Sequence, residues 1–120
     1  MNDRIQFISH QKKQILCVDF SNCLPHEVEK IVRSVPDYVT TQPRNSVLVL
    51  SDFTGASFDR DAIRAIKETA VFDKPYVKKS ALVGGGNLSE VLGQSLEEFA
   101  RREFPTFKSR EDALTWLIEE

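Results

Sequence analysis

No stretch of this sequence is apolar for long enough to cross a membrane. Its longest apolar runs are short, such as VLVL at 47–50, whereas a membrane-spanning helix needs about 20 consecutive apolar residues. The sequence begins with MNDRIQFISHQKKQ, which is polar and charged and therefore unlike the apolar core of a secretion signal. We expect a cytoplasmic protein.

The sequence also lacks an excess of positive charge. Sixteen Lys and Arg residues stand against eighteen Asp and Glu residues, which gives a formal net charge of −2. Because nucleic-acid-binding proteins present a strongly basic face, we expect no nucleic-acid partner. The main local excess of cations is interpreted as solvated surface, with a patch for anionic lipid as the alternative. It consists of Lys74, Lys78, Lys79, Arg101 and Arg102.

Cysteine is scarce, with only Cys17 and Cys23 in the chain. The two are six residues apart, without the C-x-x-C spacing or the paired histidines of a zinc site. We expect both thiols to be reduced and Cys17 to act as a small buried hydrophobic residue. No metal or cofactor is predicted.

The composition is that of an ordinary globular protein. The chain has 120 residues, of which 41% are hydrophobic and 28% are charged. This size supports one hydrophobic core, and no repeat or linker divides the chain. We predict a single domain over residues 1–120.

Hydrophobic periodicity predicts five strands and about four helices. The strands are expected at 4–9, 14–20, 46–52, 76–84 and 104–107. The first helix is capped by Ser21 or Asn22 and ended by Pro36, and a polar loop follows at 37–45. The second helix begins near Asp59 and ends between Phe72 and Pro75, while the others begin at Asn87 and Ser109.

The order of these elements predicts an α/β fold with a mixed sheet. Only the four residues 10–13 separate the first two strands, so these strands form an antiparallel hairpin. Each later pair of strands has a helix between them, which requires a parallel crossover. The strands should therefore lie in chain order, with the last one, which contains Pro105, at an edge.

Each helix has apolar residues at helical spacing, which predicts its buried face. The first helix presents Leu24, Val28, Ile31, Val32 and Val35, and the second presents Ala62, Ile63, Ile66 and Ala70. The third presents Leu88, Val91, Leu92, Leu96 and Phe99, and the last presents Ala113, Leu114, Leu117 and Ile118.

Polar and small residues follow the three central strands. Because the carboxyl ends of parallel strands meet at one edge, we expect these residues to form a ligand-binding rim. The alternative is that they only make turns and helix caps. The rim comprises Asp19, Ser21, Asp52, Phe53, Gly84, Gly85, Gly86 and Asn87.

Two kinds of chemistry at this rim are weakly indicated. The glycines at 84–86 could bind phosphate through backbone amides, but the motif lacks the lysine and the spacing of nucleotide-binding loops. Asp19 and Asp52 could act as an acid–base pair or hold a metal. No complete set of nucleophile, base and oxyanion donors is found, so we predict no catalytic residues and no enzymatic activity.

Three segments of the sequence resemble one known family. They are VLVLSDFTGASFD at 47–59, KPYVKKSALVG at 74–84 and FPTFKSREDALTWL at 104–117. In these segments and in the order of its elements, the chain resembles the SpoIIAA-like branch of the STAS superfamily, the fold of anti-sigma-factor antagonists. The resemblance implies a compact α/β domain and a regulatory role through protein–protein interaction.

The resemblance also implies a docking surface and a type of partner. Switching members of the superfamily carry a phosphorylatable serine at the start of the helix after the third strand, and bind a kinase-like anti-sigma factor. At that place this chain has residues 59–62, Asp-Arg-Asp-Ala, so the serine switch is missing. We therefore predict a non-enzymatic interaction module with an unidentified protein partner. Its expected docking residues are Thr54, Ser57, Phe58, Asp59, Arg60 and Asp61.

An alternative function follows from the likeness of this branch to CRAL-TRIO lipid-transfer domains. That likeness implies a small apolar or lipid-like ligand, taken up in solution or at a membrane surface. Phe20, Phe53 and Phe58 lie near the predicted rim and would suit such a ligand. The oligomeric state is left open, and a homodimer is compatible with the sequence.

Overall fold

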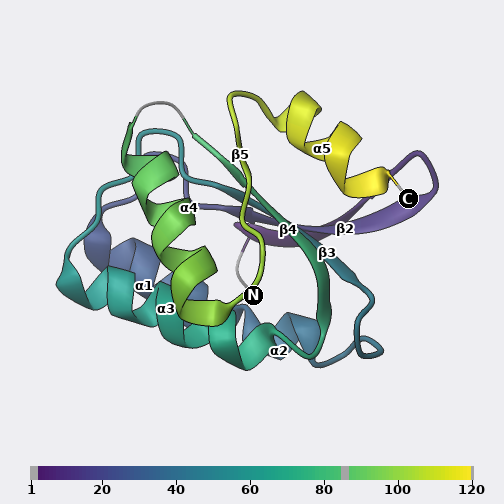
Figure 1. Ribbon diagram of the computed structural model, residues 1–120, viewed down its shortest axis with the longest axis horizontal. Helices are drawn as coiled ribbons and strands as arrows, with labels where there is room; N and C mark the ends of the chain where they lie inside the picture. The colour runs from purple at the N-terminus through teal and green to yellow at the C-terminus, as the bar shows by residue number, and fades with distance from the viewer. Residues whose placement is uncertain (1–2, 85–86, 120) are drawn as a thin grey trace.

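A mixed sheet with its strands in chain order forms the centre of the protein (Figure 1). The computed structural model describes residues 3–84 and 87–119, and only the backbone at 87–90. The strands within this part are β1 (Ile5–His10), β2 (Lys13–Asp19), β3 (Val47–Asp52), β4 (Val77–Val83) and β5 (Thr106–Phe107). β1 and β2 pair antiparallel and the remaining pairs are parallel. The predicted fold class is confirmed.

The hairpin between β1 and β2 is tighter than the four-residue connection that the sequence suggested. His10 pairs with Lys13, so only Gln11 and Lys12 form the loop. Both have positive φ, 48° and 69°, as the two central residues of a type I′ turn do. This turn matches the twist of the strands and fixes their register.

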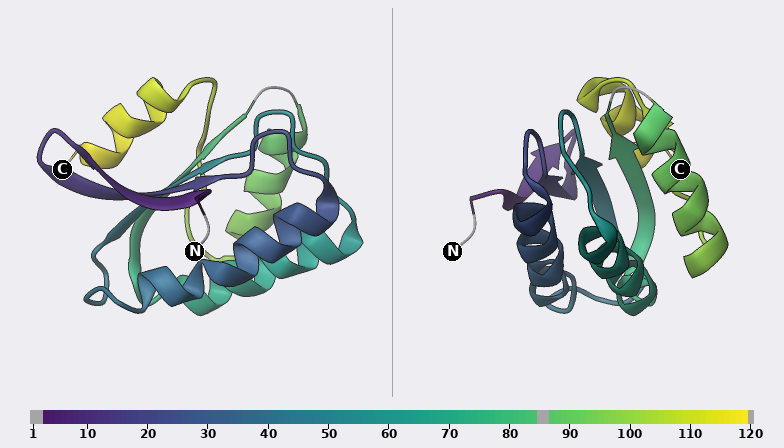
Figure 2. Two further views of the ribbon diagram at one scale, coloured as in Figure 1. Left: turned by 180° about the vertical axis from the view of Figure 1, so that it is seen from behind. Right: turned by 90° about the vertical axis from the view of Figure 1, so that its left-hand side faces the viewer.

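Helices cover both faces of the sheet (Figure 2). α1 (Pro25–Ser34), α3 (Arg60–Asp73) and α4 (Asn87–Ala100) lie on one face, and α5 (Arg110–Ile118) covers the other. A one-turn helix, α2 (Pro36–Val39), lies at the end of α1, where the sequence analysis placed a loop. A proline at the first position of a helix loses no hydrogen bond, so Pro36 begins a helix here as well as ending one.

Two hydrophobic cores follow from strands that are buried on both faces. In β3, Val47 and Val49 face α1 and α3, while Leu48 and Leu50 face α5. A strand covered on both sides is apolar at consecutive positions, which explains the run VLVL. Cys17 is buried in the core beneath α5, and both cysteines are free thiols, as predicted.

The start of α1 differs from its prediction. Neither Ser21 nor Asn22 caps this helix; the N-cap is Leu24, whose N–H donates to the Glu27 carboxylate at 2.9 Å. Leu24 has extended backbone there and its side chain is 55% exposed, so its predicted burial is wrong. The other predicted residues of this face, Val28, Ile31, Val32 and Val35, are buried.

The orientation of α4 also differs from its prediction. Val91 and Phe99 are exposed, whereas Leu92, Leu96 and Ala100 are buried. The reason is Gly93: a Cβ at this position would lie 2.9 Å from the Phe104 carbonyl oxygen. This close approach turns the Leu92–Gly93 side of the helix toward the sheet. The side chain of Leu88 lies outside the described residues.

The faces of α3 and α5 agree more closely with prediction. In α3, Ala62, Ile66 and Ala70 are buried, and Ile63 is half-buried. Asp59 caps this helix, as predicted, by accepting a hydrogen bond from the Ala62 N–H at 2.8 Å. In α5, Ala113 and Leu117 are buried, Leu114 and Ile118 are half-buried, and Ser109 caps the helix.

Lysines of the sheet hold the carboxyl end of α5. Lys79 Nζ donates to the carbonyl oxygens of Trp116 at 2.8 Å and Glu119 at 2.9 Å, and Lys13 Nζ donates to that of Ile118 at 3.0 Å. Cations are favourable at this end of a helix because its last carbonyls lack intrahelical partners. Lys79 therefore fixes α5 to the sheet.

No helix within residues 3–84 and 87–119 is long and apolar enough to span a membrane.

Candidate functional site

The carboxyl ends of β2, β3 and β4 lie side by side. Asp19 is in register with Asp52, and Asp52 with Val83. Backbone hydrogen bonds continue between the turns: the Phe20 N–H donates to the Asp52 carbonyl, and the Asn22 N–H donates to the Thr54 carbonyl, both at 2.8 Å. The structure thus brings the first two turns of the predicted rim together. Gly84 follows directly, whereas Gly85, Gly86 and the Asn87 side chain lie outside the described residues.

Both carboxylate oxygens of Asp52 are engaged by protein groups. Oδ1 accepts hydrogen bonds from the Thr54 N–H at 3.0 Å and its hydroxyl at 2.7 Å, and Oδ2 accepts one from Arg110 Nε at 2.7 Å. Burial opposes ionisation of this carboxyl group, but the hydrogen bonds from Thr54 and Arg110 outweigh it and lower its pKa. Asp52 is therefore a fixed anion.

Arg110 links the two aspartates of the rim. Its Nη2 lies 3.4 Å from Asp19 Oδ1, while its Nε is bound to Asp52. Asp19 also accepts a hydrogen bond from the Ser21 N–H at 2.9 Å, and Arg4 Nη1 lies 3.9 Å away. The two negative charges are thus balanced by two arginines, an arrangement that stabilises the turns.

Sequence reasoning missed Arg110, which is 58 residues from Asp52 in the chain. One signal was available. Arg110 is the first residue of α5, where acidic residues are favoured and a cation is unfavourable. A cation in that place indicates a separate partner, and here the partner is the Asp52 carboxylate. Within the described residues, no cluster of His, Cys, Asp and Glu has the arrangement of a metal site.

Replacing Arg110 by methionine should raise the pKa of Asp52 and lower stability at pH 7 by about 1 to 2 kcal/mol. The guanidinium is 45% exposed, so the effect is smaller than for a fully buried pair. Ionised Asp52 stabilises the fold above its unfolded-state pKa, and this contribution is lost as pH falls through the lowered folded-state pKa. The difference in stability between Arg110→Met and the wild-type protein should therefore become smaller at acidic pH.

NMR titration of the Asp52 carboxyl and urea unfolding measure the two effects. Lys108→Met is the control, because Lys108 is an exposed cation two residues before Arg110. It should change neither the pKa of Asp52 nor the stability of the protein. An unchanged Asp52 pKa in Arg110→Met would contradict the assigned role.

The predicted docking residues form one exposed segment at the rim. Thr54, Ser57, Asp59, Arg60 and Asp61 are exposed, and Phe58 is half-buried. Asp59 is engaged as the N-cap of α3 and Thr54 is bound to Asp52. This leaves mainly the side chains of Arg60 and Asp61 for a partner.

Phe53 points into the core and not toward solvent. Its ring is stacked on Phe20 with centroids 4.5 Å apart and planes 3° from parallel, and the Phe58 ring packs against it at a tilt of 53°, with centroids 5.3 Å apart. Phe20 and Phe53 are both buried. Together they form the inner wall of a cavity that extends away from the rim.

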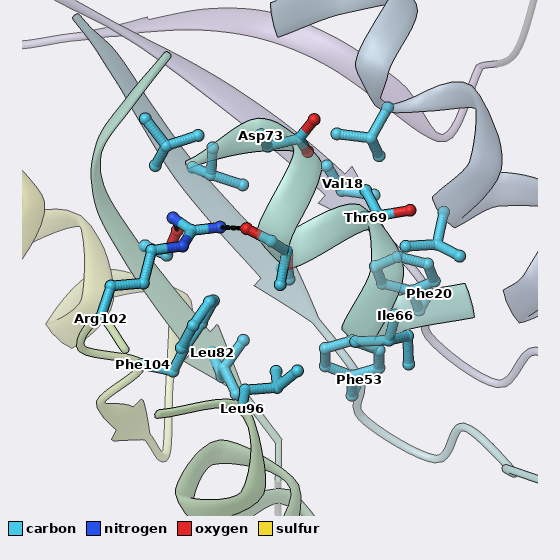
Figure 3. Close-up of a pocket in the computed structure, with 17 residues that line it drawn as sticks. Val18, Phe20, Phe53, Ile66, Thr69, Asp73, Leu82, Leu96, Arg102 and Phe104 are labelled. Atoms are coloured by element: carbon cyan, nitrogen blue, oxygen red, sulfur yellow. Dashed lines mark hydrogen bonds between the residues drawn. The ribbon is translucent and has the colours of Figure 1, made fainter. Parts of the chain in front are cut away.

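This cavity lies between the sheet and the helices α1, α3 and α4 (Figure 3). About 50 Å³ of it is open to the centres of water-sized molecules, which is room for about three waters. Its walls are mostly apolar. They include Phe20, Phe53, Ile66, Leu82, Leu96 and Phe104.

The far end of the cavity is polar and contains Asp73 and Arg102. Arg102 donates from Nη1 to the Ser80 hydroxyl at 3.0 Å and from Nη2 to the Ala70 carbonyl at 3.1 Å, and its guanidinium lies 4.5 Å from the Phe104 ring centroid. Two buried polar atoms have no hydrogen-bond partner among the described residues, Asp73 Oδ1 and Arg102 Nε. Such unsatisfied groups are rare in folded proteins.

Burial changes the acidity of both groups. Asp73 is 4% exposed, and burial raises its pKa to about 7 even though the charge of Arg102 acts in the opposite direction. Burial likewise lowers the pKa of Arg102 to about 10, against the effect of Asp73. The lining of the cavity therefore includes a carboxyl group that releases its proton far less readily than an exposed aspartate does.

Neither residue was recognised as a site residue from the sequence. Arg102 was grouped with the solvated cations, but its side chain is half-buried and reaches the cavity. Asp73 continues the buried face of α3, three residues after Ala70 and seven after Ile66. A carboxylate at helical spacing on an apolar face was the signal that could have identified it.

The fold is also known from a solved structure. The chain is similar to a protein from Shewanella loihica PV-4, described as an uncharacterized protein from the DUF3478 family with a SpoIIAA-like fold. The similarity covers 94% of this chain and 91% of that one, with a TM-score of 0.71 and 20% sequence identity. No family model matches the sequence, and no curated protein matches it. The predicted SpoIIAA-like fold is therefore confirmed, and at this identity the likeness concerns the fold alone.

Proposed function

We propose that this protein is a non-enzymatic binding module that takes a small apolar ligand into the cavity between the sheet and helices α1, α3 and α4. The observation that supports this function is a buried cavity whose lining is mostly apolar and also includes the charged residues Asp73 and Arg102. Ligand pockets typically combine apolar walls with a few convergent polar groups. This cavity has mostly apolar walls and a small number of polar residues in its lining.

The volume of the cavity limits the size of the ligand. An engineered cavity of about 150 Å³ binds benzene, and this one offers about 50 Å³. It therefore suits two or three non-hydrogen atoms, which is a very short aliphatic molecule or one end of a longer one. A whole lipid chain does not fit the cavity as it stands.

Titration with ethanol, which has three non-hydrogen atoms, followed by amide NMR, tests this function. We expect saturable shifts at residues that line the cavity, with an affinity in the millimolar range for so small a ligand. Val18→Ile combined with Val49→Ile adds two methylenes to the cavity walls and should weaken binding. Val47→Ile, a buried substitution on β3 outside the cavity, is the control. The proposal is refuted if the amide shifts of the wild-type protein do not change. It is also refuted if the Val18→Ile/Val49→Ile variant binds the probe as tightly as the wild-type protein does.

A second candidate function is protein docking at the segment Thr54–Asp61. It is supported by the exposure of this segment beside the rim and by Arg60 and Asp61, adjacent charges of opposite sign at the start of α3. Such a surface suits a partner with complementary charges. The partner expected from the sequence, a kinase-like anti-sigma factor, belongs to this hypothesis.

Arg60→Ala combined with Asp61→Ala should reduce capture of specific partners from native cells at least about tenfold, because both rim charges are removed. The variant keeps the net charge and the Asp59 cap. Lys74→Ala with Glu98→Ala, which removes one exposed charge of each sign elsewhere, is the matched control. Quantitative mass spectrometry of the captured proteins gives the result. Equal capture by wild type and the docking variant would exclude this surface.

A further inference from the structure

We propose that the exposed edge of β1 pairs with the same edge of a second copy of this chain, so that their two sheets become one. β1 and β5 are the two edges of the sheet (Figure 2). β5 has only two residues and directly follows Pro105, which has no N–H to donate. β1 has six residues, pairs with β2 without a bulge and contains no Lys, Arg, Asp, Glu or Pro. Proteins usually protect an edge strand by such features, so the edge of β1 indicates a partner.

The backbone groups of β1 that face outward belong to Ile5, Phe7 and Ser9. The Asp19 N–H donates to the Arg4 carbonyl at 2.7 Å, so these two residues form a hydrogen-bonded pair. Hydrogen-bonded and non-hydrogen-bonded pairs alternate along an antiparallel ladder. The N–H and C=O groups of residues 5, 7 and 9 therefore point away from β2. Within residues 3–84 and 87–119, no turn or loop forms a hydrogen bond with these groups.

A two-fold axis beside Phe7 satisfies all of these outward groups. Antiparallel pairing about this axis places Phe7 opposite the partner's Phe7, and Ile5 opposite the partner's Ser9. Facing residues in such a register exchange both of their hydrogen bonds, so residues 5, 7 and 9 of each copy gain partners. Because a two-fold interface uses the same patch on both copies, the edge of β1 supplies both sides of the contact.

The side chains near the axis are compatible with this register. Phe7 is half-buried and packs on Tyr38, with ring centroids 6.4 Å apart. Its contact with the partner's Phe7 adds an aromatic cross-strand pair, and such pairs stabilise antiparallel sheets. At each end of the paired strands, the exposed Asp3 of one copy lies near the turn that contains the partner's Lys12, which is also exposed. Opposite charges therefore meet where the two strands end, which favours this alignment of the copies.

Sedimentation velocity of the whole chain at a series of concentrations tests the proposal. We expect a monomer–dimer equilibrium with a Kd of about 1 to 100 µM. Ser9→Pro should weaken dimerisation at least about tenfold, because it removes an outward N–H that takes no part in the pairing with β2. Ser9→Thr keeps this N–H at the same exposed position and is the matched control, which should dimerise as the wild-type protein does.

A pair of charged variants tests the register independently of Ser9. Phe7→Lys and Phe7→Glu each place like charges opposite one another at the axis, which opposes pairing. Each variant alone should be monomeric, whereas an equimolar mixture should form a heterodimer, because an ammonium group then faces a carboxylate. A wild-type chain that stays monomeric up to about 1 mM, well above this Kd range, would show that a second copy does not pair with β1. Undiminished dimerisation of Ser9→Pro, or a mixture that forms no heterodimer, would also overturn the proposal.

Discussion

Asp73→Asn is expected to stabilise the folded protein by about 2 to 4 kcal/mol at pH 8 and by almost nothing near pH 4. The ordinary pKa of an aspartate is 3.8, and burial raises that of Asp73 to about 7. Above pH 7 the folded protein contains an ionised carboxylate at a position that is 4% exposed. Asparagine has a similar shape and no charge, so it avoids the cost of burying the ionised group.

The direction of this pH dependence follows from proton binding. Between pH 4 and 7 the folded state holds a proton on Asp73 that the unfolded state has released. The stability that protonated Asp73 contributes to the folded state is fully present below the unfolded-state pKa. It is lost as pH rises through the folded-state pKa. The advantage of Asp73→Asn should therefore grow by about 1 kcal/mol for each pH unit between 4 and 7.

Urea unfolding at pH 4.5, 6 and 8 measures this dependence. Asp61→Asn, which replaces an exposed aspartate of the same helix, is the control and should change stability by less than about 0.5 kcal/mol at each pH. Asp73→Asn could change the free energy of unfolding equally at pH 4.5 and pH 8, or it could destabilise the protein at pH 8. Either result would show that Asp73 is not a buried carboxyl group with a raised pKa.

Phe53→Ala is expected to destabilise the protein by about 3 to 5 kcal/mol. The ring is 5% exposed, is stacked on Phe20 and contacts Phe58. Its removal takes away the burial energy of an aromatic ring and also enlarges a cavity that is already present. A domain of this size has a total stability of about 5 to 15 kcal/mol, so the variant should lose a large part of it.

Thermal and urea unfolding measure the loss, and Phe72→Ala is the matched control. Phe72 is 56% exposed, and truncating it should have an effect within about 0.5 kcal/mol. A Phe53→Ala variant no less stable than Phe72→Ala would show that the ring stack is not part of the core.

Much of the fold could be predicted because its signals are local. The run VLVL in β3 indicates a strand buried on both faces, and Asp59 and Ser109 are helix caps whose role depends on a few neighbouring residues. The errors arise where tertiary packing decides. Gly93 sets the rotation of α4 through its approach to the Phe104 carbonyl, and no periodicity in the helix contains that information.

The site was predicted only in part, for a similar reason. The neighbouring positions of Asp19 and Asp52 follow from parallel strands in register, which the sequence pattern indicates. Their arginine partner comes from α5, which contributes Arg110 from the other end of the chain. Asp73 and Arg102 were missed because charged residues are usually solvated, and only the packing of α3 and α4 places them in the interior.

The attachment of α5 determines what the loss of this short helix would do. Nine residues cover an apolar sheet face that includes Ile15, Leu48 and Leu50, and the helix is fixed by a guanidinium at its start and by lysine ammonium groups at its end. Cleavage of the chain before Arg110 would therefore convert the smaller of the two hydrophobic cores into open surface. Molecules clipped in this way should self-associate into aggregates, even with β1 to β4 and their helices intact.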